Sequence, residues 1–276
     1  MSLIPRTAGF ELSFTLTRHW IPEENHDRPS RPSARLDAAA LPRSAHYDPE
    51  WVLTHLMGPN PLWLTESLTD RMQLRPGLRV LDLGCGTALS SIFLAREFGV
   101  QVWATDLWIS ASDNWERIRA AGLQDRVFPI HAEAHALPFA AGFFDAVISV
   151  DAFHYFGTDD LYLGYLAPFI RPGGQLGLIS PGVRDEFTVV PEHLAPYWGP
   201  DAWSYHSPHW WRRHWSKGGV LEVKSAEFLD HGWQEWRDWN LLCQRHGYSF
   251  YQPDIDMLTA DQGRHLGFTQ VVAVRP

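Results

Sequence analysis

A short glycine-rich motif constrains the fold of this chain more than any other feature. Residues 80–87 read VLDLGCGT. A second apolar run, 101–106, ends at Asp106, twenty positions after Gly86. A strand that leads into such a turn and then a helix brings backbone N–H groups close to a ligand, because glycine has no Cβ to block the approach. A carboxylate at the end of the next strand can accept both hydroxyls of a ribose. The pair predicts a site for a nucleoside-bearing cofactor.

The composition of the turn indicates which cofactor it suits. A dinucleotide motif requires G-x-G-x-x-G, whereas Thr87, Ala88 and Leu89 follow the second glycine here without a third. Asp82 lies two residues before the first glycine, Gly84. A carboxylate at this point would repel a pyrophosphate, and it suits an ammonium group or a water network instead.

Four ordered segments between residues 78 and 180 share a family resemblance. The D-x-G-x-G pattern resembles motif I of the class I S-adenosylmethionine-dependent methyltransferases, of the small-molecule, type 11-like kind. Segments 130–139, 143–157 and 169–180 are similar to the later motifs of that family, in the same order. The resemblance implies S-adenosylmethionine as cofactor and S-adenosylhomocysteine as product. The cofactor contacts that it implies are Tyr47, Asp82, Gly84, Cys85, Gly86, Asp106, Leu107, Glu133, Ala134 and Asp151, with Glu133 and Ala134 at the adenine edge.

Strand-like and helix-like segments alternate along the chain. Such alternation implies an α/β fold with a parallel sheet and right-handed crossovers. The resemblance adds a Rossmann-like, mostly parallel seven-stranded sheet with helices on both faces and a closing antiparallel strand. The expected strands are 79–83, 101–105, 127–130, 146–150, 175–180, 220–228 and 267–274. The expected helices are two short ones within 48–71, followed by 88–98, 112–121, 159–170, 208–215 and 232–245.

The domain organisation follows from where the alternation of strand-like and helix-like segments begins and where it is interrupted. Residues 1–71 are expected to form an N-terminal arm and lid helices, because the first 45 are mixed and rich in Pro, Arg and Asp. Residues 72–276 are expected to form the methyltransferase domain, with an inserted cap at 181–219. Most of the 14 tryptophans lie outside the motif-bearing core. Aromatic rings can line a substrate pocket as well as fill a core.

The loop after the fourth expected strand is the candidate catalytic segment. It reads DAFHYFG over 151–157, and such a loop lies beside the reacting group in a doubly wound sheet. His154 is a candidate general base, because imidazole accepts a proton near neutral pH, and the alternative is that it only packs. Asp151 is expected to contact the cofactor or to cap the loop. The candidate substrate contacts are Trp63, Tyr155, Tyr205 and Trp210.

The same loop has a distant likeness to the cyclopropane fatty acid synthases. That family has a similar AFHYFG loop, and residues 46–48 resemble the HYD segment that precedes its motif I. Two departures argue against the same activity: His154 stands where that family has a glutamate, and no partner cysteine is evident near Tyr47. Only a cofactor-side role carries over, in which Tyr47 closes over the methionine moiety or simply packs.

Metal binding and disulfides are not expected. His206, His209 and His214 cannot all share one helical face, and no acidic or thiol ligand joins them at a regular interval. The two cysteines, Cys85 and Cys243, form neither a disulfide framework nor a C-x-x-C motif. The expected metal content is therefore none.

Charge and hydrophobicity limit the partners. A net charge of −9 argues against a nucleic-acid substrate, which requires a basic face. We find no membrane-spanning stretch and no signal segment in the sequence, so a cytoplasmic location is expected. The irregular N-terminal arm makes a homodimer conceivable.

The sequence thus favours an enzyme that methylates a small organic molecule at O, N or C by in-line transfer. Two alternatives stay open. The first is a lipid or prenyl C-methyltransferase, or a cyclopropane-synthase-like enzyme, which a long apolar channel under the tryptophan-rich cap would favour. The second is a non-catalytic, cofactor-binding scaffold that regulates a partner.

Overall fold

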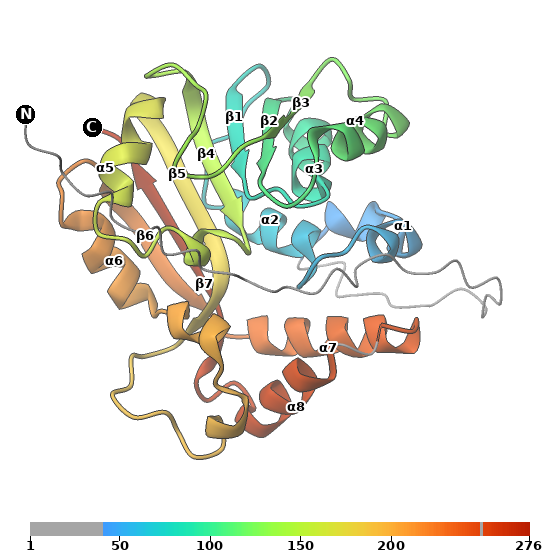
Figure 1. The fold of residues 1–276 in the computed structure, drawn as a ribbon, viewed down its shortest axis with the longest axis vertical. Helices are drawn as coiled ribbons and strands as arrows, with labels where there is room; N and C mark the ends of the chain where they lie inside the picture. Colours follow the sequence, from blue (N-terminus) through green and yellow to red (C-terminus); the bar gives the residue numbers. More distant parts are fainter. Residues whose placement is uncertain (1–40, 249–250) are drawn as a thin grey trace, which may run out of the picture. The chain divides into compact units, whose positions relative to one another are not determined.

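Seven strands form one sheet in the computed structural model, which describes residues 41–248 and 251–276 (Figure 1). The strand order is β3-β2-β1-β4-β5-β7-β6. This confirms the expected α/β fold with a mostly parallel seven-stranded sheet. The strands are β1 (Arg79–Leu83), β2 (Gln101–Asp106), β3 (Val127–His131), β4 (Phe144–Val150), β5 (Ile170–Val183), β6 (Glu222–Leu229) and β7 (Leu266–Val274).

Four of the described α-helices begin after a residue whose side chain accepts from their first N–H groups. The Asn60 side chain accepts from the N–H groups of Leu62 and Trp63 at the start of the second helix, and Ser110 accepts from Asp113 N at the start of the fourth. The α-helices are α1 (Pro49–Thr54), α2 (Pro61–Thr69), α3 (Leu89–Phe98), α4 (Ala111–Ala120), α5 (Tyr162–Leu166), α6 (Pro208–Ser216), α7 (Gly232–Arg245) and α8 (Gln252–Asp261).

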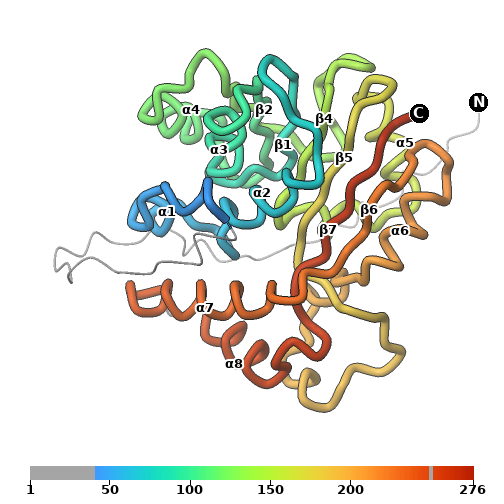
Figure 2. The backbone as a smooth tube through the Cα atoms, turned by 180° about the vertical axis from the view of Figure 1, so that it is seen from behind, coloured from blue at the N-terminus to red at the C-terminus, as the bar shows by residue number. Residues whose placement is uncertain are grey.

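The order of the strands creates a switch point between β1 and β4. The chain proceeds outward from β1 through β2 to β3, then returns to the other side of β1 and continues from β4 to β5. Strands β1 to β5 pair in parallel, whereas β7 pairs antiparallel with both β5 and β6. Figure 2 shows β7 between these two strands. In open α/β sheets, ligands bind at the carboxyl ends of the strands beside such a switch point.

Alternate residues of the strands enter two separate cores. Val80 packs with residues of α2, α3, α7 and α8 on one face of the sheet. Its neighbour Leu81 packs with residues of α5 and α6 on the other face. The alternation follows from the pleat of a strand, in which successive side chains point to opposite faces. Helices therefore cover both faces, as the resemblance implied.

The inserted segment 181–219, which the sequence predicted to be a cap, contributes one α-helix to a face of the sheet. Its helix α6 packs against β6 and β7. Trp211 and Trp215 of α6 are completely buried in the core on that face of the sheet. The tryptophans of this helix therefore stabilise the sheet, because their large apolar rings are removed from water there.

Two helices differ from their predicted form. The predicted helix 159–170 is α-helical only over Tyr162–Leu166, and a 3-10 turn over Ala167–Phe169 follows it. Pro168 explains the early end, because proline lacks the N–H group that an interior helical position needs. We did not predict α8, whose buried apolar residues Ile255, Met257 and Leu258 lie in a polar segment without an extended stripe.

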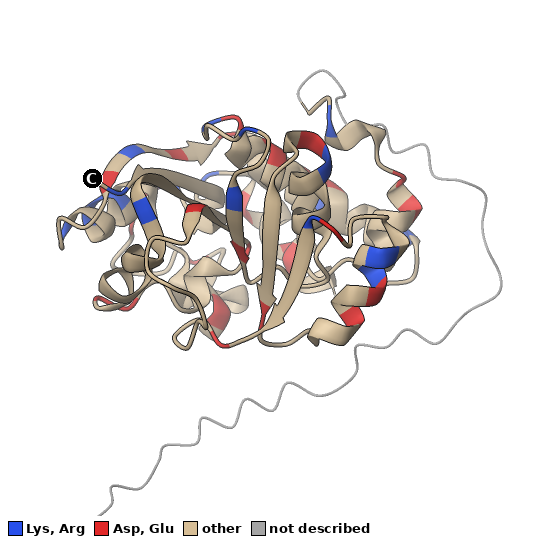
Figure 3. Cartoon of the chain, turned by 90° about the horizontal axis from the view of Figure 1, so that it is seen from above, with Lys and Arg blue, Asp and Glu red and all other residues tan. Residues whose placement is uncertain are grey.

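The remaining expectations about organisation concern surface and termini. Residues 1–40 of the predicted arm lie outside the described residues, so the arm and its dimer contact stay predictions. None of the helices within 41–248 and 251–276 is long and apolar enough to span a bilayer. Acidic and basic residues are interspersed along the ribbon in Figure 3.

Candidate cofactor and active site

A cavity of about 320 Å³ lies at the carboxyl ends of the parallel strands. Residues that follow β1, β2, β3 and β4 line it, together with residues of the connection between α1 and α2. Volumes of this order are typical of small-molecule sites. The lining residues fall within 55–61, 83–90, 105–108, 132–135 and 150–156.

The two glycines of the turn are required by their surroundings. Gly84 has a φ of +76° and Gly86 a φ of +52°, in the left-handed region that side chains disfavour. A Cβ on Gly84 would lie 2.3 Å from the Cβ of Ala152, which follows β4. A Cβ on Gly86 would lie 2.8 Å from the sulfur of Met57. Glycine thus lets the loops after β1 and β4 meet at the switch point.

Asp106 ties two of the lining loops together. Its Oδ2 accepts a hydrogen bond from Gly86 N at 2.8 Å, and its Oδ1 accepts from Trp108 N at 2.7 Å and from Ile109 N at 2.9 Å. An ionised carboxylate offers about four acceptor sites. Three are used by backbone N–H groups, so one ribose hydroxyl fits beside them and a second would have to displace one of them. That Asp106 binds both ribose hydroxyls stays a prediction.

Asp82 lies behind the cavity rather than in its wall. It is fully buried, and its Oδ2 accepts from the hydroxyl groups of Ser90 and Ser91 at 2.6 Å each. Its Oδ1 has no hydrogen-bond partner among the residues that the structure describes. Burial raises the pKa of Asp82 to about 6. The side chain of Asp82 thus meets the first turn of α3, and Ser90 rather than Asp82 lines the cavity.

The predicted adenine segment lines the same cavity as the glycine turn. Glu133 and Ala134 are lining residues, as is the half-exposed Leu107. The Glu133 carboxylate accepts from His135 N at 2.8 Å, and its other oxygen lies 2.8 Å from His135 Nδ1. His135 therefore holds the carboxylate at the cavity wall.

Asp151 marks the other side of the cavity. It follows β4 with a φ of +54°, a conformation uncommon for residues other than glycine. Its N–H donates to Ile179 O at 2.8 Å, and its Oδ2 packs against the Cα of Gly58, at 2.7 Å from where a Cβ would stand. Burial raises the pKa of Asp151 to about 8, with a further contribution from the negative charge of Asp254.

His154 lies outside the cavity lining. It is 1% exposed. Within 41–248 and 251–276, its Nδ1 has no hydrogen-bond partner. Its ring lies edge-on to that of Tyr205, with ring centroids 5.8 Å apart. Burial lowers its pKa to about 3, so the imidazole is a weak base. These observations favour the packing role over the catalytic one. The base role remains a prediction.

Four other predicted residues also lie outside the cavity lining. Tyr47 donates to Glu97 Oε1 at 2.9 Å, and its ring contacts Trp51 and Phe93. Trp63 and Tyr205 pack within the cores, and Trp210 stacks on the ring of His206 at 3.6 Å. Tyr155, by contrast, lines the cavity, and its ring lies 5.8 Å from that of Trp108.

The connection between α1 and α2 supplies lining residues that we did not predict. Within it, His55, Met57, Gly58, Pro59 and Pro61 face the cavity. Trp239 of α7 donates to Gly58 O at 3.0 Å, and the Thr87 hydroxyl donates to the carbonyl of His55. The Gly-Pro-Asn-Pro break of 58–61 predicted a turn, and nothing local in the sequence predicted that this turn reaches the glycine motif.

The fold and the cavity together define a class of protein. A nucleoside-type cavity stands at the switch point of a seven-stranded sheet whose β7 is antiparallel, with a glycine turn after β1 and a carboxylate after β2. This arrangement is that of the class I methyltransferase fold. Residues 80–174 match the family described as a methyltransferase domain. Over these residues the chain therefore matches a methyltransferase domain, and its sheet has the class I methyltransferase fold.

Curated relatives agree with this family over part of their length. Methyltransferase GfsG of Streptomyces halstedii is 32% identical over 122 residues, which are 44% of this chain and 44% of the relative. The 27-O-demethylrifamycin SV methyltransferase of Amycolatopsis mediterranei (strain S699) is 32% identical over 133 residues, 46% of this chain and 45% of the relative. The chain thus spans less than half the length of these relatives.

Solved structures share the fold at low identity. The [4+2]-cyclase SpnF has a TM-score of 0.63 and 18% identity, over 77% of this chain and 80% of that one. Geranyl diphosphate C-methyltransferase from Streptomyces coelicolor A3(2), solved with Mg²⁺, geranyl diphosphate and S-adenosylhomocysteine, has a TM-score of 0.62 and 19% identity, over 77% and 76% of the two chains. These likenesses support the fold alone.

Proposed function

We propose that this protein transfers a methyl group from S-adenosylmethionine to a small organic molecule, at an O, N or C atom. The proposal rests on one continuous cavity that extends over both sides of the switch point. One side is walled by Gly84, Gly86 and Asp106, which suit a nucleoside. The other side is walled by Asp151 and Tyr155, which leaves a place for an acceptor next to the cofactor.

The residues of the first side fit the cofactor's polar groups. Asp106 has acceptor capacity left for a ribose hydroxyl, and Glu133 and Ala134 stand where an adenine edge would lie. The hydroxyl of Ser90 and the carboxyl of Asp151 are polar groups that could meet the ammonium group and carboxylate of the methionine end. When bound, the cofactor supplies an electrophilic methyl group on a sulfonium.

The protein contributes mainly by positioning the reactants and by excluding water from the cavity. In-line displacement needs the nucleophile, the methyl carbon and the sulfur to be aligned, and alignment alone accounts for much of the acceleration. The α1–α2 connection closes the cavity beside Asp151 through Gly58, and Trp239 fixes that connection from behind. Trp108 and Tyr155 are more than half exposed, and they line the cavity where an acceptor could stack.

A base is needed only if the acceptor atom carries a proton at working pH. Asp151 is better placed than His154 for this step, because it lines the cavity and burial brings its pKa to about 8. We therefore propose the Asp151 carboxylate as the proton acceptor for a hydroxyl or ammonium substrate at pH values near and above 8, where this group is ionised. His154 then supports the loop by packing against Tyr205.

The prenyl and cyclopropane alternatives have less support. They would need a long apolar channel under the insertion, yet no residue of 181–219 is among the cavity's lining residues. Trp211 and Trp215 are buried against the sheet instead. The second alternative, a non-catalytic, cofactor-binding scaffold, stays open, because a protein named a [4+2]-cyclase shares this fold.

Product formation tests the proposal. Purified protein is incubated with S-adenosylmethionine and three acceptor sets: phenols, small amines and prenyl diphosphates. S-adenosylhomocysteine is measured by mass spectrometry, and a Gly86→Val variant, whose side chain collides with Met57, serves as the control. Acceptor-dependent product from phenols or amines supports the proposal. Product only with prenyl diphosphates favours the first alternative, and cofactor binding without any product favours the non-catalytic one.

A further inference from the structure

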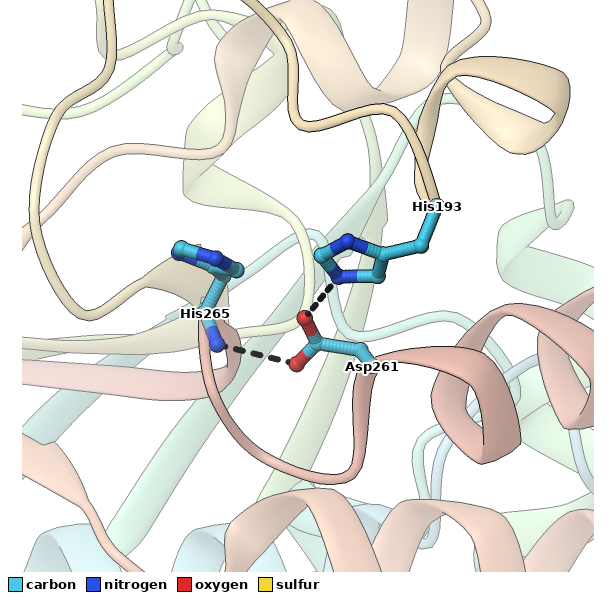
Figure 4. A group of neighbouring side chains, drawn as sticks. All are labelled: His193, Asp261 and His265. Carbon is cyan, nitrogen blue, oxygen red and sulfur yellow. Dashed lines mark hydrogen bonds and ion pairs between the residues drawn. The ribbon is translucent and has the colours of Figure 1, made fainter.

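Three potential metal ligands gather at the loop between α8 and β7, away from the cofactor cavity. Asp261 is the last residue of α8, His265 directly precedes β7, and His193 belongs to the inserted segment 181–219. One ligand atom of each lies within 4.8 Å of the others (Figure 4). His206, His209 and His214, the histidines that we weighed from the sequence, do not belong to this group.

The carboxylate of Asp261 is fixed by the backbone. The side chain is fully buried, and its Oδ2 accepts from His265 N at 2.9 Å and from Leu266 N at 2.8 Å. The other oxygen, Oδ1, lies 3.0 Å from His193 Nε2. Backbone N–H groups that bind one oxygen of a carboxylate orient its other oxygen toward a metal ion.

The two histidines approach the carboxylate from different segments. A turn holds His193 in place, in which Pro191 O accepts from Leu194 N and Ala195 N at 2.9 and 3.0 Å. The ring of His265 lies 5.5 Å from that of His193, and both residues are partly exposed. In Figure 4 both rings stand on the same side of the Asp261 carboxylate. Partial exposure leaves an ion a path from solvent.

We propose that His193, Asp261 and His265 bind a divalent transition-metal ion of the zinc type. Two imidazole nitrogens and one carboxylate oxygen form a common three-ligand zinc set, with water completing the coordination. Ligand atoms around tetrahedral zinc are about 3.4 Å apart. His193 Nε2 and Asp261 Oδ1, at 3.0 Å, are close to this spacing, and the ligand atom of the partly exposed His265 lies within 4.8 Å of both.

The ion would tie the inserted segment to the end of the sheet. Arg184 N already donates to His265 O at 2.7 Å, where β5 and β7 finish their pairing. Arg264 directs its guanidinium to the carbonyl oxygens of Ala260 and Asp261, which leaves the Asp261 carboxylate to the histidines. The site is independent of the proposed methyl transfer, and we expect it to stabilise the fold.

Calorimetric titration with ZnCl₂ tests the site. The protein is used in full length without a histidine tag, after treatment with EDTA and dialysis. We expect one high-affinity Zn²⁺ per chain and a rise in the melting temperature. His265→Ala is expected to weaken this binding at least tenfold, whereas His209→Ala, which removes an exposed histidine from the same inserted segment, should leave it unchanged.

A second variant separates metal binding from the hydrogen bond between His193 and Asp261. His193→Gln keeps a donor for Asp261 Oδ1 but removes the imidazole, so it should fold like the wild type in EDTA and lose the tight Zn²⁺ site. Co²⁺ provides a spectroscopic check, since the wild type should show visible absorption bands that His265→Ala lacks. Equal Zn²⁺ affinity in the wild type, His193→Gln and His265→Ala would overturn the proposal, as would loss of the site in His209→Ala.

Discussion

At the scale of single residues, Asp106 has two tasks that the sequence could not separate. It is predicted to bind the ribose, and it also accepts three N–H groups that shape the glycine turn and the loop after β2. A carboxylate with this many backbone bonds positions the cavity wall even without a ligand. Its removal should therefore affect binding more than the loss of one ribose contact would.

Asp106→Ala is expected to weaken binding of S-adenosylhomocysteine at least tenfold. Hydrogen bonds to a charged group contribute about 1.5–3 kcal/mol each, and tenfold corresponds to about 1.4 kcal/mol. Calorimetry measures the affinity, and Asp113→Ala, an exposed carboxylate on α4, is the control. An affinity equal to that of the wild type would remove Asp106 from the site.

Asp151 should make stability depend on pH. The unfolded chain loses this proton near the ordinary pKa of 3.8, whereas the folded chain keeps it up to about 8. The folded state therefore binds more protons between these values, and the free energy of unfolding falls as pH rises from about 4 to about 8. Asp151→Asn removes that fall and tolerates the left-handed backbone.

Thermal unfolding at pH 5 and pH 8 measures this effect. The melting temperature of Asp151→Asn, relative to wild type, is expected to be higher at pH 8 than at pH 5. Asp82, whose pKa is raised in the same direction, is unchanged in both proteins. The burial argument for Asp151 fails if the difference between the two proteins is the same at both pH values.

His154→Gln is expected to keep turnover within about tenfold of the wild type at pH 7. Loss of a general base usually costs 10²–10⁴-fold, and a buried imidazole with a pKa of about 3 is poorly suited to that role. The rate is compared once an acceptor is found. A loss of a hundredfold or more, with unchanged cofactor affinity, would restore His154 as the base.

At the scale of elements, the connection between α1 and α2 decides how the cavity closes. Its Gly58 lies against the Asp151 carboxylate, and its carbonyl accepts from Trp239 of α7. Three segments that are far apart in sequence therefore meet there. This contact gives the tryptophan-rich helix α7 a role at the site, although its rings lie outside the cavity lining.

Gly58→Ala should disturb this closure. The added Cβ would lie 2.7 Å from Asp151 Oδ2, so the carboxylate or the connection must shift. We expect weaker binding of S-adenosylhomocysteine by calorimetry and a lower melting temperature. Gly164→Ala in α5, where a Cβ meets no atom within 4 Å, is the matched control and should change neither. Identical behaviour of the two variants would contradict the closure.

At the scale of the whole molecule, five segments converge on one cavity, so ligand binding should stabilise the entire fold. A ligand at a hundred times its Kd adds about 2.7 kcal/mol to the free energy of unfolding. For a domain of this size that amounts to a rise of about 5–10 °C in melting temperature. S-adenosylhomocysteine should give this rise in thermal unfolding, and Asp106→Ala should give a smaller one at the same concentration.

The local pattern of the sequence determined the seven strands and the cofactor turn, but not the ends of β5, which spans Ile170–Val183 instead of the predicted 175–180. Val80 to Thr87 and the run that ends at Asp106 are recognisable because hydrophobic alternation and glycine act over a few residues. Ala88, the last residue before α3, adopts a positive φ of +63° as the two glycines do. The same local pattern predicted that Gly84, Gly86 and Asp106 lie at the site, and they line the cavity. The family resemblance implied Cys85, Leu107, Glu133, Ala134 and Asp151, and these residues line it too, as does Tyr155.

Only the tertiary structure decided which aromatic and ionisable side chains face that cavity. Trp210, Tyr205, Trp63, Tyr47 and His154 have the right chemistry for a site, yet packing directs them elsewhere. The same is true of the cluster formed by His193, Asp261 and His265, whose members are up to 72 positions apart. Such contacts depend on how helices and loops pack across the sheet, and this packing is a long-range property that no short stretch of sequence encodes.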